Sequence, residues 1–289
     1  MQHLKILIEL TRISKPIGFM LLFWPCTWGL TIVYNFNDSI NTYFKYILLF
    51  LVGSILMRSA GCIINDIVDK NLDKKVERTK HRPLASNKIS IQLAFTYVCI
   101  LCILAFLILI NFNNLTIILA LGSMPLAFAY PLMKRITYWP QLFLGITFNY
   151  GLILGWTSIE EQINIVPLIM YFGAIFWTLG YDTIYGFQDI KDDEIIGVKS
   201  TSIKFKKNPK FFLKLCYLIF ITSFFMIGIV MKFNILYFLA LCFAVAHLFF
   251  YQIQKLNINS EHSCLNIFKS NNILGLIIYI SLLTGKIFT

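Results

Sequence analysis

Two short segments of the chain carry acidic side chains at spacings that suit metal binding. The first, residues 65–73, follows a long apolar run and contains Asp66, Asp69 and Asp73. Their i, i+3, i+7 spacing predicts that the three carboxylates lie on one face of a helix. Three like charges on one face repel one another unless a positive charge lies between them. We therefore expect cations close to this segment.

The second segment, residues 182–194, also closes a long apolar run, and it contains Tyr185 and Gln188 among its acids. Nine of the 14 acidic residues of the chain fall in or next to these two segments. They are Asp66, Asp69, Asp73, Glu77, Asp182, Asp189, Asp192, Asp193 and Glu194. So uneven a distribution predicts that the rest of the chain is a scaffold that brings the two segments together.

Composition places this scaffold in a membrane. The chain has 289 residues, of which 58% are hydrophobic and only 13% are charged, and its mean hydropathy is +0.73. About 20 apolar residues cross a bilayer as a helix, and the chain contains many runs of this length. We predict an all-α, polytopic integral membrane protein that forms a single domain over residues 1–289.

We expect about nine membrane-spanning segments. Each should be a helix, because a lone segment in lipid must satisfy its own backbone hydrogen bonds. The expected spans are residues 17–34, 46–64, 93–110, 115–130, 140–156, 165–181, 211–231, 235–251 and 272–288. The break between the third and fourth spans rests on Asn111, Phe112, Asn113 and Asn114.

The basic residues predict the orientation of these spans. Twenty-one of the 25 Lys and Arg lie in the N-terminal segment or in and next to the loops after spans two, four, six and eight. Positive residues favour the cytoplasmic side, so we expect a cytoplasmic N-terminus and an external C-terminus. Both acidic segments then lie at cytoplasmic helix ends. The first 15 residues resemble neither a cleavable signal nor a transit peptide, which favours a bacterial inner membrane over a mitochondrial inner membrane.

The net charge of +11 has two interpretations. Most of it follows the predicted topology and the attraction of anionic lipid headgroups, so nucleic acid is not an expected partner. However, basic residues also adjoin both acidic segments: Arg78, Lys80 and Arg82 follow the first, and Lys191 and Lys199 adjoin the second. Carboxylates with cations at one membrane depth indicate a divalent metal together with a phosphate group.

Other reactive side chains carry less information. The seven cysteines lie mostly in apolar spans, and the pair Cys99 and Cys102 lacks ligand partners, so we expect packing roles for them. Arg58 differs, since it lies inside the second span, where an ionised side chain is costly and is usually functional or paired. A structural salt bridge to another helix is the alternative for Arg58.

Both acidic segments resemble the two signatures of the UbiA superfamily of intramembrane prenyltransferases. The first signature is matched by Asn65, Asp66, Asp69, Asp73, Arg78, Thr79, Arg82, Pro83 and Leu84. The second is matched by Asp182, Tyr185, Gln188, Asp189, Asp192 and Asp193, with Gly186 in place of the family's Ala. Residues 15–18, 24–25, 57–62, 130–135 and 197–201 further resemble the branch that prenylates 4-hydroxybenzoate.

The resemblance implies nine helices around a central cavity that is capped by the loops after spans two and six. It also implies two Mg²⁺ ions, one held by Asn65, Asp69 and Asp73, the other by Asp182, Asp189 and Asp193. By the same analogy, Asp69, Asp73, Asp182 and Asp189 are catalytic, and Asp189 accepts the phenol proton. Arg78, Arg82, Lys134 and Lys199 would bind the diphosphate. Arg58, deeper in the span, would bind the aromatic acceptor.

The expected reaction is Mg²⁺-dependent transfer of a polyprenyl group from polyprenyl diphosphate to 4-hydroxybenzoate, at the carbon ortho to the hydroxyl, in ubiquinone synthesis. Haem, a naphthoate or homogentisate are alternative acceptors within the superfamily. A transporter is the alternative outside it, because acids within a membrane also mark ion paths. Transporters commonly place such groups near the bilayer midplane, whereas both acidic segments here close the apolar runs.

Overall fold

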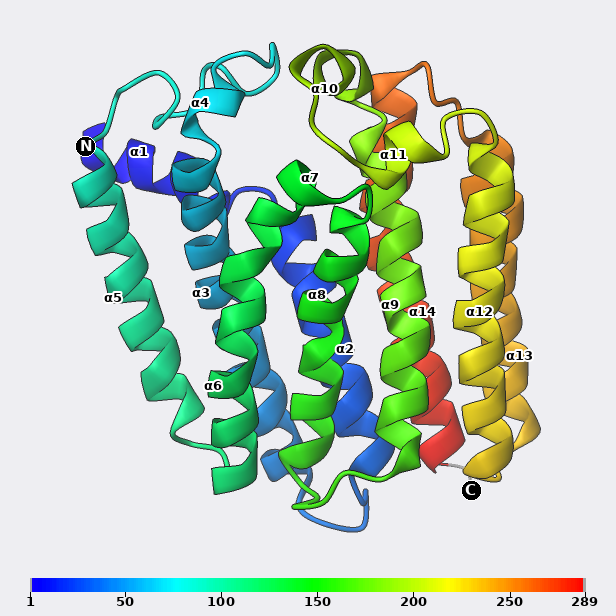
Figure 1. Cartoon of the computed structure of the whole chain (residues 1–289). Helices are drawn as coiled ribbons and strands as arrows, with labels where there is room; N and C mark the ends of the chain where they lie inside the picture. Colours follow the sequence, from blue (N-terminus) through cyan, green and yellow to red (C-terminus); the bar gives the residue numbers. More distant parts are fainter. Residues whose placement is uncertain (1, 288–289) are drawn as a thin grey trace.

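A computed structural model describes residues 2–287, and every regular element in this range is helical (Figure 1). The long helices are α2 (Ile17–Val33), α3 (Ile40–Val68), α5 (Ile91–Leu109), α6 (Asn114–Ala129), α8 (Pro140–Thr157), α9 (Ile165–Gly186), α12 (Pro209–Val230), α13 (Ile235–Ala246) and α14 (Glu261–Ile287). The shorter elements are α1 (Gln2–Thr11), α4 (Lys70–Asp73), η1 (Tyr130–Leu132), α7 (Met133–Ile136), α10 (Ile190–Ile196), α11 (Thr201–Lys204) and η2 (His247–Ile253).

Each of the nine expected spans coincides with a long helix or, for 235–251, with α13 and η2 together. Seven described helical stretches are long and apolar enough to cross a membrane. They do not include α2, which has only 17 residues, or α8. Gln141 and Asn149 lie within α8 and lower its hydropathy. The protein therefore has multiple membrane-spanning helices, and the count of nine stays a prediction, as does the single domain over residues 1–289.

The last helix differs most from its expected bounds. We expected a span over 272–288, but α14 begins at Glu261. The difference arises because Glu261, His262 and Lys269 made the start of this segment look like a loop. In the structure this polar first part continues the helix toward the loops at the N-terminal end of the bundle (Figure 1).

Polar residues define the ends of several long helices. The predicted break before Asn114 is confirmed, because the side chain of Asn113 accepts a hydrogen bond of 2.9 Å from the amide of Thr116 at the start of α6. Asn113 also donates to the carbonyl of Thr157 at 2.6 Å, which ties this turn to the end of α8. Such caps satisfy amides that have no partner inside the helix.

Glycines bring α2 and α8 together at the centre of the bundle. A Cβ at Gly29 would lie 2.0 Å from the carbonyl oxygen of Leu152, and one at Gly155 would lie 2.1 Å from that of Cys26. Only residues without a side chain allow backbones to approach this closely. The contact fixes α2 against α8 beneath the end of the bundle that carries the acidic segments.

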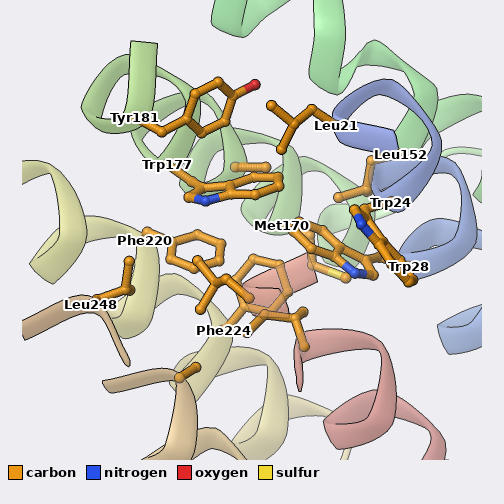
Figure 2. Packing of buried hydrophobic residues seen from close by; sticks show 14 of the residues in the cluster. Leu21, Trp24, Trp28, Leu152, Met170, Trp177, Tyr181, Phe220, Phe224 and Leu248 are labelled. Carbon is orange, nitrogen blue, oxygen red and sulfur yellow. The ribbon is translucent and has the colours of Figure 1, made fainter. Parts of the chain in front are cut away.

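A cluster of buried rings joins α2, α9 and α12 (Figure 2). Trp28 and Trp177 have ring centroids 5.0 Å apart, and Trp177 stacks on Phe220 at 5.9 Å. Large apolar side chains such as Phe243 are, by contrast, exposed on the outside of the bundle. This distribution matches a protein whose outer surface contacts lipid.

The two ends of the bundle differ. At one end, α1, α4, α7, α10 and α11 lie over the long helices, together with the N-terminus (Figure 1). We call this the capped end. The C-terminus lies at the opposite end, as predicted from the number of spans. The assignment of the capped end to the cytoplasm stays a prediction.

Candidate active site

A cavity of about 930 Å³ opens at the capped end. All eleven residues predicted from the sequence as site residues line it: Asn65, Asp69, Asp73, Asp182, Asp189, Asp193, Arg78, Arg82, Lys134, Lys199 and Arg58. They come from α3, α4, α7, α9, α10 and the loops between them. The expectation that the scaffold brings the two acidic segments together is confirmed.

The first acidic segment is not one continuous helical face, so that expectation was wrong. Helix α3 ends at Val68, and Asp69 links it to α4 with φ −95° and ψ 5°. Asp66 therefore belongs to α3 and Asp73 to α4. Asp66 does not line the cavity, whereas Asp69 and Asp73 do. Repulsion among the three carboxylates is offset by nearby cations: Lys134 pairs with Asp69, and Arg82 contacts both Asp66 and Asp73.

Arg82 lies between two of these carboxylates. Its Nη1 is 3.0 Å from Asp66 Oδ1 and 2.9 Å from Asp73 Oδ2. Asp66, of which only 2% is exposed, also pairs with Arg12 from the segment that joins α1 to α2. Arg12 itself has a left-handed backbone with φ 53°. The expectation of positive charge between the acids is confirmed.

Asp69 is fully buried and pairs with Lys134 of α7. Arg135 lies 3.5 Å from Asp69 Oδ1 and donates to the carbonyl of Val68 at 2.6 Å. Burial raises the pKa of the Asp69 carboxyl above its usual range, and Lys134 opposes this shift. A further positive charge in the cavity would favour the ionised form of Asp69.

In the second segment, Asp189 pairs with Arg78. Arg78 Nε donates to Asp189 Oδ1 at 2.7 Å, and its Nη1 donates to the hydroxyl of Tyr185 at 3.2 Å. Asp193 follows one turn later, at the start of α10. Burial, with a smaller contribution from the charge of Asp189, raises the pKa of Asp193 to about 6.

The remaining predicted residues lie around this centre. Asn65 and Asp182 are half-buried in the cavity wall, on α3 and α9. The backbone amide of Lys199 donates to the carbonyl of Lys134 at 2.8 Å, and its Nζ donates to the carbonyl of Ile136 at 3.1 Å. These bonds hold the loop after α10 against α7.

Arg58 lies deeper, on α3, with its guanidinium 5.4 Å from the ring centroid of Phe148 on α8. Its Nε is buried and makes no hydrogen bond to the described part of the chain. Within residues 2–287, Arg58 has no carboxylate within salt-bridge distance, so the alternative of a structural salt bridge finds no support. A cation that lines a cavity without forming a salt bridge is suited to bind an anionic group.

The donor groups suit a hard divalent cation. Six acidic side chains, the five predicted aspartates and Glu9, line one cavity together with the Asn65 amide, and oxygen ligands of this kind are preferred by Mg²⁺. In the described residues no three acidic, His or Cys side chains converge on one point. The carboxylates are instead neutralised by Arg78, Arg82 and Lys134. Asp69 Oδ1 is buried and accepts no hydrogen bond from the described residues, with Arg135 at 3.5 Å, so it has lone pairs to offer a metal.

Comparison with known proteins agrees with this geometry. Residues 22–274 match the model of the UbiA prenyltransferase family. The chain belongs to this family. Its members include two 4-hydroxybenzoate polyprenyltransferases to which the chain is similar. The human mitochondrial protein is 41% identical over 281 residues, 97% of this chain and 75% of the relative. The 4-hydroxybenzoate octaprenyltransferase of Psychromonas ingrahamii is 39% identical over 278 residues, 96% of this chain and 95% of the relative.

Solved structures share the fold. The apo structure of a UbiA homolog from Aeropyrum pernix has a TM-score of 0.73 and 21% identity, and the match covers 94% of this chain and 97% of that one. A UbiA homolog from Archaeoglobus fulgidus bound to GPP and Mg²⁺ has a TM-score of 0.71 and 17% identity, and the match covers 96% of this chain and 99% of that one.

Several residues that line the cavity had no role predicted from the sequence. Arg12 and Lys15 enter from the segment before α2, and Lys269 enters from α14. Arg12 and Lys15 could have been recognised from the sequence, because they are cations just before the apolar span that starts at Ile17. They were counted only as indicators of topology. Lys269 could not have been recognised in this way, because it lay in an expected loop.

Proposed function

We propose that this protein transfers a polyprenyl group from polyprenyl diphosphate to the ring carbon ortho to the hydroxyl of 4-hydroxybenzoate, with Mg²⁺, in ubiquinone biosynthesis. The observation that carries the proposal is the convergence of both acidic segments and the four predicted diphosphate ligands on one cavity in a membrane-spanning bundle. The names of relatives about 40% identical over nearly the whole chain support the choice of acceptor and donor.

The acidic side chains would hold the metal. Asn65, Asp69 and Asp73 would form one set of ligands, and Asp182, Asp189 and Asp193 a second. When bound, Mg²⁺ offsets the negative charge that develops on the leaving diphosphate. A structure of a UbiA homolog bound to GPP and Mg²⁺ supports the use of a divalent metal.

The basic side chains would bind the diphosphate. Arg78, Arg82 and Lys134 now pair with Asp189, Asp73 and Asp69. On binding, these cations would exchange carboxylate oxygens for diphosphate oxygens, which frees the carboxylates for the metal. Lys199, whose Nζ donates to the carbonyl of Ile136 and lies 5.7 Å from the ring centroid of Tyr138, would add a fourth charge.

In the transfer step, the C1–O bond of the donor breaks and its electron pair leaves with the diphosphate. The ortho carbon of the acceptor forms a bond to C1, and the ring then loses the proton that this carbon carried. Arg58 would bind the acceptor carboxylate. Asp189 would accept the phenol proton as the ring attacks, and a proton would return to the oxygen when the ortho proton leaves, so that one proton is released in all. The apolar walls of the cavity exclude water from the cation at C1.

The location is also a proposal. Relatives include a bacterial protein and mitochondrial ones, and we propose the bacterial inner membrane, with the capped end in the cytoplasm. The assignment of the capped end to the cytoplasm rests on the basic residues at that end.

Product analysis tests the function. Membranes containing the protein receive 4-hydroxybenzoate and prenyl diphosphates of several lengths, and products are identified by mass spectrometry. We expect 4-hydroxybenzoate bearing one prenyl group on the ortho carbon. Parallel reactions with haem, a naphthoate or homogentisate would reveal a different acceptor. Absence of any prenylated product with all four acceptors would contradict the proposal.

A further inference from the structure

Three aromatic rings form one wall of the cavity. Tyr181 and Tyr185 come from α9, and Phe268 comes from α14. The ring centroids of Tyr185 and Phe268 are 4.5 Å apart, and those of Tyr181 and Phe268 are 5.8 Å apart. We call these three residues the aromatic wall. Ring faces of this kind attract a nearby cation.

A buried polar network lies behind this wall. Trp177, whose ring centroid is 5.1 Å from that of Tyr181 (Figure 2), donates from Nε1 to Asn271 Oδ1 at 2.8 Å. Gln252 Nε2 donates to the same oxygen at 3.1 Å. The hydroxyl of Tyr217 donates to Gln252 Oε1 at 2.6 Å. The network thus joins α9, α12, η2 and α14.

The network also holds the backbone that carries the wall. Asn271 Nδ2 donates to the carbonyl of Ile267 at 3.2 Å and to the carbonyl of Phe268 at 3.1 Å. Because Oδ1 accepts from both Trp177 and Gln252, the orientation of the Asn271 amide is fixed. Asn271 therefore links the ring beneath Tyr181 to the backbone of Phe268, so both sides of the wall are positioned by one side chain.

Apolar side chains would have filled this space at lower cost. Trp177, Tyr217, Gln252 and Asn271 are all 0% exposed, and buried polar groups destabilise a protein unless they are fully hydrogen-bonded. The π-helix η2, which contains Gln252, is also a rare element, and such elements are frequent at functional sites. A costly network placed directly behind the cavity wall indicates a positioning role.

We infer that the Trp177–Asn271–Gln252 network positions the aromatic wall so that its rings shield and stabilise the cation formed at C1 of the prenyl donor. This inference rests on the proposed function. Once the C1–O bond breaks, the cation has two fates. It either bonds to the acceptor ring, which loses a proton, or bonds to water, which loses a proton and leaves a polyprenol. A displaced wall admits water and favours the second fate.

The test measures how the donor divides between these fates. Trp177→Phe keeps a ring beside Tyr181 but removes the donor to Asn271, and Asn271→Leu removes the centre of the network at similar volume. Products are quantified by mass spectrometry in ¹⁸O-labelled water, which marks polyprenol formed by water capture. We expect the ratio of labelled polyprenol to prenylated acceptor to rise about three- to thirtyfold, as loss of a cation–π contact would produce.

Tyr43→Phe is the matched control. Tyr43 is 2% exposed, and its hydroxyl lies 2.8 Å from Thr31 Oγ1 and 2.9 Å from the Tyr279 hydroxyl, far from the capped end. Its loss should leave the product ratio unchanged. A merely structural network would lower the amount of folded protein without changing the ratio. Should Asn271→Leu not fold, Trp177→Phe decides alone.

The same product measurements distinguish failure of the proposed function from failure of the positioning role. A wild-type protein that forms no prenylated 4-hydroxybenzoate contradicts the proposed function. A wild type that forms this product, with Trp177→Phe giving the wild-type ratio, contradicts the positioning role and leaves the proposed function standing.

Discussion

Arg78 and Asp189 join the two acidic segments across the top of the cavity. Arg78 Nε donates to Asp189 Oδ1 at 2.7 Å, although 111 residues separate the two in the sequence. One residue comes from the loop after α4 and the other directly precedes α10. The pair holds the two loops of the capped end against each other, and its members are also a predicted diphosphate ligand and a predicted metal ligand. Substrate binding therefore has to replace this contact.

Loss of one carboxylate from either segment should abolish turnover. We expect Asp69→Asn and Asp189→Asn each to lower the rate by about a hundredfold or more, because groups that act together in one site lose their function together. EDTA should inhibit the wild type, and added Mg²⁺ should restore it. The rates are measured by product formation per folded protein in membranes.

Glu160→Gln is the control for these variants. Glu160 lies beyond the end of α8, opposite the capped end, and is exposed, so its neutralisation should have no effect. Near-normal activity of Asp69→Asn or of Asp189→Asn would show that the two segments do not share one metal site.

The contact between α2 and α8 predicts a local limit on side-chain size. A Cβ at Gly155 would lie 2.1 Å from the carbonyl oxygen of Cys26, so Gly155→Ala forces the helices apart. We expect a loss of about 1–3 kcal/mol in stability from this overpacking, seen as a lower Tm in detergent. Gly122→Ala is the matched control, since a Cβ there meets nothing within 4 Å. Equal Tm values for the two variants would contradict the close approach.

Much of the scaffold was predictable because membrane-spanning helices occur in the sequence as long apolar runs. The positions of the nine segments and the meeting of both acidic segments at one end follow from this pattern. The start of α14 was not predictable in the same way, because Glu261 and Lys269 read as loop residues. A helix that rises beyond the hydrocarbon to line a cavity tolerates such residues, so hydropathy alone does not find its first turns.

The pairing of acidic with basic side chains could not be predicted from the sequence either. Residue spacing predicted an unbroken acidic face, but α3 ends before Asp69, and the cation that pairs with Asp69 is Lys134, 65 residues away. Similarly, Arg12 reaches Asp66 through a left-handed backbone, a conformation that side-chain sterics disfavour and that tertiary contacts impose. Which cation meets which acid is decided by such long-range contacts.

Labelling of single cysteines tests the orientation of the bundle. In a protein whose seven cysteines are replaced, Lys80→Cys and Lys206→Cys should react with an impermeant thiol reagent only from the cytoplasmic side. Glu160→Cys should react only from outside. The physical reason is that 21 of the 25 basic residues belong to the capped end or its helix ends. Reaction of all three from the same face would overturn the predicted topology.

Arg58 provides the sharpest test of the acceptor. Its Nε lacks a hydrogen bond within the described chain, and it lies seven residues before Asn65, roughly 10 Å of helix rise deeper. A carboxylate para to the acceptor hydroxyl would pair with this guanidinium. Arg58→Leu should then weaken acceptor binding by about 2–4 kcal/mol, which raises the KM for 4-hydroxybenzoate about tenfold or more. The KM for the prenyl diphosphate should hardly change.

Two further variants separate charge from geometry at this position. Arg58→Lys should recover only part of the loss, since an ammonium lacks the planar pair of donors. Gly18→Ala should raise the same KM by a smaller factor, because its Cβ would lie 2.8 Å from Arg58 Nε and displace the guanidinium without removing its charge. Both substrate dependences are measured with protein level controlled. If Arg58 only stabilised the bundle, Arg58→Leu would lower the amount of folded protein and weaken the binding of both substrates equally. That result would exclude the acceptor role.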